Sequence, residues 1–323
     1  MKLVVFTCAL NEEKTLGKVL DMIPKEIEGV SEIVKLVIDD GSTDRTAEIG
    51  KKHGAIVIPN KKQKRLAYSF QQGVAKALDL GADIAVNIDA DLQFNPQEIP
   101  GMIKPIISGE KDFIAADRFT DKKTGKVRRP KNMPVGKYLS NRVGSWVVSR
   151  LTGYKFPDVT CGFRAYNRKA LLSLNINSKY TYTQESFQIL ALQKLNIGSL
   201  PVTVKYFPGR KSRVVTSFFS FLFGSAVNIL RAFRDFAPLS FFGLLGGISF
   251  LFGAILEAAV FLRYILTGSF SPYIFVAFIG GYFITLGIII WIVGIMADML
   301  DRIRNNQEKM MYILKELRYP KAK

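Results

Sequence analysis

Histidine and cysteine are scarce in this chain, which has one His and two Cys among its 323 residues. Cys8 and Cys161 have no second cysteine or histidine at a metal-binding spacing, so we predict reduced thiols rather than a disulfide or a zinc site. His53 lies in a polar stretch, where we expect a surface position. These positions argue against a zinc centre and against a catalytic histidine.

Two glycine-rich signatures of nucleotide binding are also missing. The first apolar run, residues 2–7, is not followed by G-x-G-x-x-G, and the chain contains no Walker P-loop. A dinucleotide fingerprint and a phosphate cradle of the ATPase kind are therefore excluded. Met1 leads directly into this run, so we expect no signal peptide.

The first hundred residues alternate apolar runs with amphipathic segments. This rhythm predicts an α/β domain with a mostly parallel sheet flanked by helices. The helix expected at residues 44–53 should be capped by Ser42 or Thr43. The expected strands are residues 2–7, 33–38, 55–58 and 82–88, and the expected helices are residues 12–22, 44–53 and 66–78.

Long apolar stretches are confined to the last third of the chain. Residues 239–262 and 273–297 contain a single charge, Glu257. Each stretch is long enough to cross a hydrocarbon core of about 30 Å as a helix, so we predict two membrane spans. The loop between them holds one basic residue, Arg263, whereas several basic residues lie on either side of the pair. These are Arg210, Lys211, Arg213, Arg231 and Arg234 before it, and Arg302, Arg304, Lys309, Lys315 and Arg318 after it.

The positive-inside rule then places both termini in the cytoplasm of a two-span membrane protein. The formal charge of +18 would suit nucleic acid, but the membrane surface is the nearer anionic partner, so we expect a lipid bilayer and no nucleic acid. The expected divisions are a cytoplasmic domain at 1–213, an amphipathic interface helix at 214–236, the hairpin at 237–297 and an amphipathic cytoplasmic tail at 298–323.

Two acidic motifs follow predicted strands, at the sheet edge where open α/β sheets bind ligands. Asp89-Ala-Asp91-Leu-Gln93 places three oxygen-bearing side chains on one face of an extended segment, a pattern that suits Mg²⁺ or Mn²⁺. A solvated turn is the alternative interpretation. We expect the second motif, Asp39-Asp40-Gly-Ser-Thr-Asp44, to lie near a base or a ribose. The other interpretation of this motif is a capped strand-to-helix turn.

A basic stretch at residues 113–167 follows these motifs. A run of charge is usually a solvated face, but between a metal motif and a membrane anchor it also suggests phosphate binding. Its basic residues are Arg118, Arg128, Arg129, Lys131, Lys137, Arg142 and Arg164.

Taken together, the Asn11-Glu12-Glu13 loop and the two acidic motifs resemble family 2 glycosyltransferases of the GT-A fold. The strings at residues 89–98 (DADLQFNPQE) and 158–165 (DVTCGFRA) are similar to the dolichol-phosphate mannose synthase and polyisoprenyl-phosphate glucosyltransferase branch, as are the two closing spans.

This resemblance implies inverting transfer of a hexose to a dolichyl or polyprenyl monophosphate at the cytoplasmic membrane face, for glycan assembly. The donor would be a nucleotide sugar of the GDP-mannose or UDP-glucose type, and the cofactor Mg²⁺ or Mn²⁺. A homo-oligomer is left open.

The resemblance also implies roles for individual residues, among which Asp91, Arg118 and Glu185 would be catalytic. By position, the metal would be held by Asp89, Asp91 and Gln93; the nucleotide sugar by Asn11, Glu13, Asp39, Asp40, Arg210 and Arg213; and the acceptor phosphate by Arg118, Arg129, Lys137 and Ser140.

Two other interpretations remain. A processive polysaccharide synthase shares the nucleotide-binding half but needs a Q-x-x-R-W motif and more spans, and the tryptophans here, Trp146 and Trp291, are not in that context. A non-enzymatic membrane adaptor would use the basic face for lipid or protein binding, and it leaves the metal motif unexplained.

Overall fold

The structure is a computed structural model that describes residues 1–176, 182–206, 233–234 and 237–320. The chain divides into two compact units, one made of Met1–Ser225 with Met310–Lys323 and the other of Ala226–Lys309. The expected interface helix at 214–236 falls almost entirely outside the described residues.

The first unit is built around a seven-stranded sheet with the order β3-β2-β1-β4-β6-β5-β7. Neighbouring strands are parallel except at β6, which runs antiparallel to both β4 and β5. The mostly parallel sheet expected from the sequence is therefore confirmed. The strands are β1 (Lys2–Ala9), β2 (Glu32–Asp39), β3 (Ile56–Pro59), β4 (Ile84–Asn87), β5 (Phe113–Asp117), β6 (Arg164–Asn167) and β7 (Ile197–Pro201).

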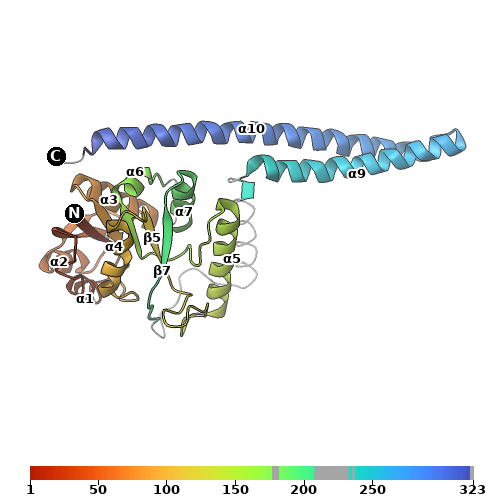
Figure 1. Ribbon diagram of the computed structural model, residues 1–323. Coiled ribbons are helices and arrows are strands. Elements are labelled where there is room, and N and C mark those ends of the chain that lie inside the picture. Colours follow the sequence, from red (N-terminus) through yellow and green to blue (C-terminus); the bar gives the residue numbers. More distant parts are fainter. Residues whose placement is uncertain (177–181, 207–232, 235–236, 321–323) are drawn as a thin grey trace. The chain divides into compact units, whose positions relative to one another are not determined.

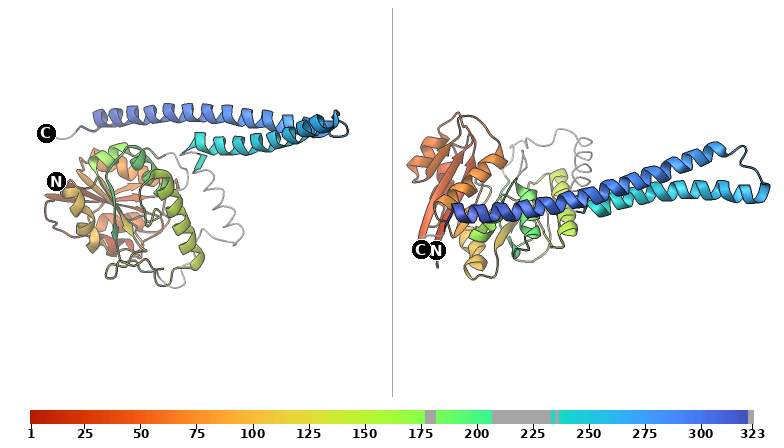
Figure 2. Two further views of the ribbon diagram at one scale, coloured as in Figure 1. Left: turned by 45° about the vertical axis from the view of Figure 1, so that its right-hand side comes forward. Right: turned by 90° about the horizontal axis from the view of Figure 1, so that it is seen from above.

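Helices cover both faces of this sheet, as Figures 1 and 2 show. Strands β1, β4 and β5 are buried on both sides, which accounts for their continuous apolar runs. The helices of the first unit are α1 (Leu16–Asp21), α2 (Thr46–Lys52), α3 (Leu66–Asp79), η1 (Pro96–Glu98), α4 (Ile99–Ile107), α5 (Val135–Thr152), α6 (Arg168–Ser173) and α7 (Thr183–Leu192).

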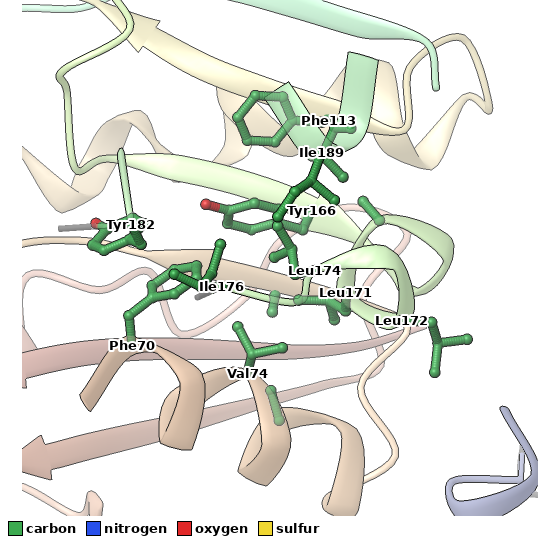
Figure 3. Packing of buried hydrophobic residues seen from close by; sticks show 14 of the residues in the cluster. Phe70, Val74, Phe113, Tyr166, Leu171, Leu172, Leu174, Ile176, Tyr182 and Ile189 are labelled. Atoms are coloured by element: carbon green, nitrogen blue, oxygen red, sulfur yellow. The ribbon is translucent and has the colours of Figure 1, made fainter. Parts of the chain in front are cut away.

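Alternate residues of each strand supply two separate cores. On one face Val4 and Phe6 of β1 pack with α3, α6 and α7, and on the other Leu3 and Val5 pack with α1 and α4. Figure 3 shows the first of these cores, where the ring of Phe70 stacks on that of Tyr182 with their centroids 3.7 Å apart. The two-sided core holds the sheet, and hence its edges, in a defined geometry.

Two helices begin later than the sequence pattern predicts. The helix expected at 12–22 starts at Leu16, because the backbone amides of Glu12 and Glu13 donate to Thr46 Oγ1 and Asp44 Oδ2 instead of entering a helix. The helix expected at 44–53 starts at Thr46. The expected caps were wrong: the N-cap position is occupied by Arg45, while Ser42 Oγ accepts from the amide of Asn11 and the hydroxyl of Thr43 donates to Asn11 Oδ1.

The second unit is a pair of apolar helices, α9 (Pro238–Thr267) and most of α10 (Ile274–Arg318), running side by side (Figures 1 and 2). Both are long and apolar enough to cross a membrane by length and composition. They meet along glycines seven residues apart: a Cβ added at Gly253 would lie 2.5 Å from the carbonyl oxygen of Gly280, and one at Gly246 would lie 2.8 Å from that of Gly287. Small residues allow this close approach. Helix α10 continues past residue 297 to Arg318, so most of the expected amphipathic tail at 298–323 is helical.

Candidate functional site

The candidate site lies at one edge of the sheet, where the carboxyl ends of β1, β2, β4 and β5 meet. Because β6 runs in the opposite direction, the segment that leads into β6 reaches the same edge. Residues far apart in the sequence, such as Asp89 after β4 and Gly162 before β6, are brought together in this way. Ligands of open α/β sheets bind at this kind of edge.

The acidic motif is held in place by its neighbours. The carboxylate of Asp89 lies against the α-carbon of Gly162, close enough that an added Cβ would be 2.7 Å from Oδ1. Asp91 Oδ1 accepts a hydrogen bond of 3.1 Å from the backbone amide of Gln93, across Leu92, whose φ is 60°. The side chain of Asn87 donates to the carbonyl of Gly162 at 2.7 Å, which ties β4 to the segment before β6.

This donor set fits a hard divalent cation that is shared with a substrate. Among the residues that the structure describes, no three His, Cys, Asp or Glu side chains gather as a complete metal cage. Two carboxylates, at Asp89 and Asp91, would leave coordination positions for phosphate oxygens, which is how Mg²⁺ is usually bound in proteins. The residues present therefore suit Mg²⁺ or Mn²⁺ with part of its coordination left to a substrate.

Arg118, at the end of β5, is clamped by a buried carboxylate. Its Nε donates to Asp158 Oδ2 at 2.6 Å and its Nη2 donates to Asp158 Oδ1 at 2.9 Å, with a third bond to Thr160 and a fourth to the hydroxyl of Tyr206. These bonds use four of the five N–H donors of the guanidinium and leave at most one for a substrate. Burial raises the pKa of Asp158, but the adjoining guanidinium outweighs it and holds that pKa below its ordinary value.

Lys137, in the first turn of α5, brings a second positive charge to the acidic motif. Burial and the charge of Arg118 lower the pKa of this lysine, while the carboxylates of Asp91 and Asp89 act in the opposite direction. Its ammonium lies 5.3 Å from the centre of the Tyr206 ring. Lys137 is therefore near enough to the carboxylates of Asp89 and Asp91 and to Arg118 to interact with them electrostatically.

The loops after β1 and β2 are joined by hydrogen bonds at the same edge of the sheet. Asn11, with φ of 54°, accepts from the amide of Thr43 at 2.9 Å, and Glu13 accepts from the amide of Arg45 at 3.3 Å. Asp39 is buried at the strand end and accepts from the amide of Ser42 at 3.0 Å. All three predicted residues therefore lie in one connected loop pair.

Asp40 differs from Asp39 because its carboxylate forms several hydrogen bonds within the protein. It accepts hydrogen bonds from the amides of Lys64 and Arg65, the hydroxyl of Ser69 and the side chain of Asn60. These contacts anchor the loop that leads into α3. Of the two carboxylates, Asp39 is the better candidate for a nucleoside.

The remaining predicted residues lie farther along the basic stretch. Arg129 is exposed and donates to the carbonyl of Met133 at 3.1 Å. Ser140 donates to the carbonyl of Lys137 at 3.0 Å within α5, and Glu185 occupies the first turn of α7, which packs against α5. Arg210 and Arg213 lie outside the described residues.

Arg164 shows that the basic stretch is not a uniform phosphate-binding surface. Its guanidinium is fully buried and donates to Ser186 and to the carbonyls of Cys161, Val159 and Thr183. It therefore braces the segment before β6 against α7.

The two cysteines are free, as the sequence predicted, and burial raises the pKa of Cys161 to about 12, so this thiol stays protonated at neutral pH. His53 pairs with Asp21 at 2.7 Å on the surface, away from the sheet edge that holds the acidic motif.

Sequence reasoning missed three residues that shape this site: Asp158, Gly162 and Tyr206. The first two were visible within the string at 158–165, but their roles depend on partners 40 and more residues away. No sequence motif marks Tyr206 as a residue of the site. It reaches Arg118 because the amide of Lys205 donates to the carbonyl of Gln93 at 2.9 Å.

Comparison with known families gives one match over more than half of the chain. The model of Glycosyl transferase family 2 matches residues 4–174, which include both acidic motifs and the segment before β6.

Two relatives with named activities are similar to more than half of the chain. The UDP-N-acetylglucosamine–dolichyl-phosphate N-acetylglucosaminyltransferase of Methanococcus voltae is 32% identical over 218 residues, which are 61% of this chain and 83% of that protein. The dolichyl-phosphate hexose transferase of Haloferax volcanii is 30% identical over 229 residues, which are 70% of this chain and 90% of that protein.

Solved structures support the fold. The glucosyl-3-phosphoglycerate synthase of Mycobacterium tuberculosis, crystallised with Mn²⁺, uridine diphosphate and phosphoglyceric acid, aligns with a TM-score of 0.53 at 20% identity. The alignment covers 72% of this chain and 77% of the synthase.

Proposed function

The chain belongs to glycosyl transferase family 2, and we propose that it transfers a hexose from a nucleotide sugar to a dolichyl or polyprenyl monophosphate, with inversion at the anomeric carbon. The donor is of the GDP-mannose or UDP-glucose type. The product is a lipid-phosphate-linked sugar for glycan assembly. The names of the Methanococcus and Haloferax relatives, both dolichyl-phosphate sugar transferases, support this choice of acceptor.

One observation carries the proposal: two carboxylates and two cations meet at a single sheet edge. Asp89 and Asp91 suit a metal-bound diphosphate, while Lys137 and the remaining N–H of Arg118 suit a second phosphate beside it. A hydrolase of nucleotide sugars would have no use for a second anion site. A transferase that joins a sugar diphosphate to a phosphate acceptor needs both.

The chemistry needs little proton transfer. A phosphate monoester has its second pKa at about 6, so the acceptor is already an anionic nucleophile at neutral pH. Its oxygen attacks the anomeric carbon as the bond to the nucleoside diphosphate breaks, and the sugar configuration inverts. Lys137 and Arg118 would offset the repulsion between the two phosphates and align the acceptor oxygen with the carbon that it attacks.

A divalent ion held by Asp89 and Asp91, with Gln93 beside them, would stabilise the charge that develops on the leaving diphosphate. Asn11, Glu13 and Asp39 would orient the nucleoside, since hydrogen bonds join the two loops that carry them. Glu185 would contact the acceptor from the first turn of α7. Arg129, in the loop before α5, and Ser140, within α5, would complete the acceptor-phosphate site. The glucosyl-3-phosphoglycerate synthase, which resembles this chain in fold, was crystallised with Mn²⁺, and this supports a divalent cofactor.

The membrane hairpin explains how a water-soluble donor and a lipid acceptor meet. An isoprenoid tail keeps the acceptor in the bilayer, so the enzyme must work at the headgroup level. We propose that α9 and α10 span the membrane and that the domain and both termini face the cytoplasm, because basic residues flank the pair and only Arg263 lies between the apolar stretches.

The test is transfer by the purified full chain reconstituted in vesicles that contain polyprenyl or dolichyl phosphate. Each of GDP-mannose, UDP-glucose and UDP-N-acetylglucosamine is supplied with a labelled sugar, and the lipid product is identified by mass spectrometry. The proposal expects one donor to give a sugar-phosphate lipid, and it expects Asp91→Ala to remove the product. Chains of sugar on the lipid would instead indicate a processive synthase, and no product from any donor would favour a non-enzymatic adaptor.

A further inference from the structure

Tyr206 reaches the candidate site from the segment that follows β7. An antiparallel bridge joins Val204 to Phe94, and the amide of Lys205 donates to the carbonyl of Gln93 at 2.9 Å. These contacts hold the segment beside the one that carries the acidic motif. Exposure alternates along it, since Lys205 is exposed whereas Val204 and Tyr206 are partly buried. The Tyr206 side chain therefore lies on the inner side of its segment, at the edge of the sheet.

The hydroxyl of Tyr206 accepts a hydrogen bond from Nη1 of Arg118 at 3.2 Å. Asp158 and Thr160 take three other N–H groups of this guanidinium, so its last unused proton lies on the same Nη1. The tyrosine keeps its own proton, which no group among the described residues accepts. Burial raises the pKa of Tyr206 although Arg118 acts in the opposite direction, so the O–H stays intact at neutral pH. One O–H donor and one N–H donor thus lie side by side.

The charges around Tyr206 favour an anion as the partner of these two donors. The ammonium of Lys137 lies 5.3 Å from the centre of the tyrosine ring. Asp158 neutralises Arg118, and a divalent ion would offset the carboxylates of the acidic motif, so Lys137 leaves a positive charge in surplus. A neutral sugar hydroxyl would leave that charge unbalanced. A phosphate can accept from both donors and balance the charge as well.

We propose that the Tyr206 hydroxyl donates a hydrogen bond to the acceptor phosphate, next to the last N–H of Arg118. The inference rests on the proposed transfer to a lipid monophosphate and adds a residue to its acceptor site. Because Arg118 uses four of its N–H groups within the protein, Tyr206 supplies a second donor where the guanidinium has only one left. The hydrogen bond from Arg118 polarises the hydroxyl and strengthens the bond that it donates in turn. The positive charge of Arg118 thereby acts on the phosphate through Tyr206.

The test is equilibrium binding of farnesyl phosphate, a short isoprenyl monophosphate, to the purified full chain in detergent without any sugar donor. Calorimetry compares the natural chain with Tyr206→Phe, which keeps the ring beside Lys137 and loses only the hydroxyl. The inference expects the variant to bind about 10-fold more weakly, because a hydrogen bond to a charged group is lost. Farnesol lacks the phosphate, so its affinity should be the same for both proteins. In vesicles, Tyr206→Phe should raise the KM for the lipid phosphate by a similar factor and leave the KM for the donor unchanged.

Tyr154→Phe is the matched control, since it removes a tyrosine hydroxyl elsewhere in the same domain. This hydroxyl donates to the carbonyl of Leu195 at 3.4 Å. Leu195 precedes β7, which runs parallel to β5, so the contact lies at the edge of the sheet opposite the acidic motif. Tyr154→Phe should therefore bind farnesyl phosphate as the natural chain does. If Tyr206→Phe fails to fold, 3-fluorotyrosine at position 206 gives a fluorine resonance that farnesyl phosphate should shift and farnesol should not.

Two results would overturn the inference. One is equal binding of farnesyl phosphate by Tyr206→Phe and the natural chain, including no detectable binding by either, or a fluorine resonance that farnesyl phosphate does not move. The other is a loss of affinity that is as large for farnesol, because the hydroxyl would then act on the protein and not on the phosphate. Transfer to lipid phosphate with unchanged binding in Tyr206→Phe would refute this inference alone. A 10-fold difference in binding without transfer from any donor would refute only the proposed reaction.

Discussion

The carboxylate of Asp89 lies against the α-carbon of Gly162, where an added Cβ would come within 2.7 Å of Oδ1 and 2.9 Å of Oδ2. Two strands create this contact, since Asp89 follows β4 and Gly162 precedes the antiparallel β6. The first residue of the acidic motif is therefore positioned by a glycine more than seventy residues away.

Gly162→Ala should displace this carboxylate and lower transfer activity by about 100-fold, since a shift of 1 Å in a catalytic group can cost this much. The fold should persist, so the circular dichroism spectrum should match that of the natural chain. Gly101→Ala is the control: its Cβ would meet Leu200 at an ordinary 3.6 Å, and activity should be retained. Full activity in Gly162→Ala would show that Asp89 need not occupy its present position.

Removal of divalent ions should abolish transfer, and Mg²⁺ or Mn²⁺ should restore it, because the two carboxylates at Asp89 and Asp91 need a cation to hold a diphosphate. The measurement is initial rate after treatment with excess chelator and then after titration with each ion. In Asp91→Asn, which loses one charge at constant shape, restoration should require a higher ion concentration. Undiminished activity in excess chelator would defeat the metal assignment.

Asp158→Ala should destabilise the domain by about 3–5 kcal/mol, because it leaves the guanidinium of Arg118 buried without its counter-charge. Chemical denaturation followed by circular dichroism measures this change. Glu32→Ala removes the exposed ion pair with Lys2 and should cost about 1 kcal/mol or less. Equal losses in the two variants would mean that the Arg118–Asp158 pair contributes no more than a surface pair.

The same pair predicts a pH dependence of stability. The pKa of Asp158 is lower in the folded state than in the unfolded chain, where it is about 3.9. The pair therefore contributes its full stability above about pH 4, and this contribution is lost as the pH falls through the folded pKa. The difference in unfolding free energy between the natural chain and Asp158→Asn should be constant at neutral pH and shrink below about pH 4. A difference that grew in acid would contradict the assignment.

Lys137→Met should raise the KM for the lipid phosphate by about 10–100-fold, because a charged hydrogen bond to a phosphate is worth about 1.5–3 kcal/mol. The KM for the donor should change little. Lys131→Met, at an exposed lysine that precedes α5, serves as the control and should leave both values unchanged. A larger effect on the donor than on the acceptor would move Lys137 to the diphosphate side.

Arg118→Ala should also weaken use of the acceptor more than binding of the donor, but with a loss of stability that Lys137→Met does not share. The reason is that Arg118 donates four hydrogen bonds inside the protein. Comparing the KM of the acceptor with the unfolding free energy of each variant separates the two contributions. An Arg118→Ala protein of natural stability would show that the clamp is dispensable to the fold.

The sequence predicted the first four strands and the mostly parallel sheet because buried parallel strands are continuous apolar runs, a signal that each segment carries by itself. It missed the start of α1 and the caps of α2. Those boundaries depend on hydrogen bonds between two loops, such as the one from the amide of Glu13 to Asp44, and propensity within one segment cannot report them.

The same division applies to the site. By itself, the sequence determined where the acidic motifs, the basic stretch and the apolar hairpin lie along the chain, because each is a local pattern of charge or hydropathy. Only the tertiary structure decided which charges remain for a substrate. Asp40, Arg118 and Arg164 are engaged by partners that the sheet brings from elsewhere in the sequence, whereas Lys137 is brought to the acidic motif. Whether a charged side chain can contact a substrate depends on its neighbours in space. The segments that follow β4 and β5 and precede β6 meet at one edge of the sheet, and this meeting sets those neighbours.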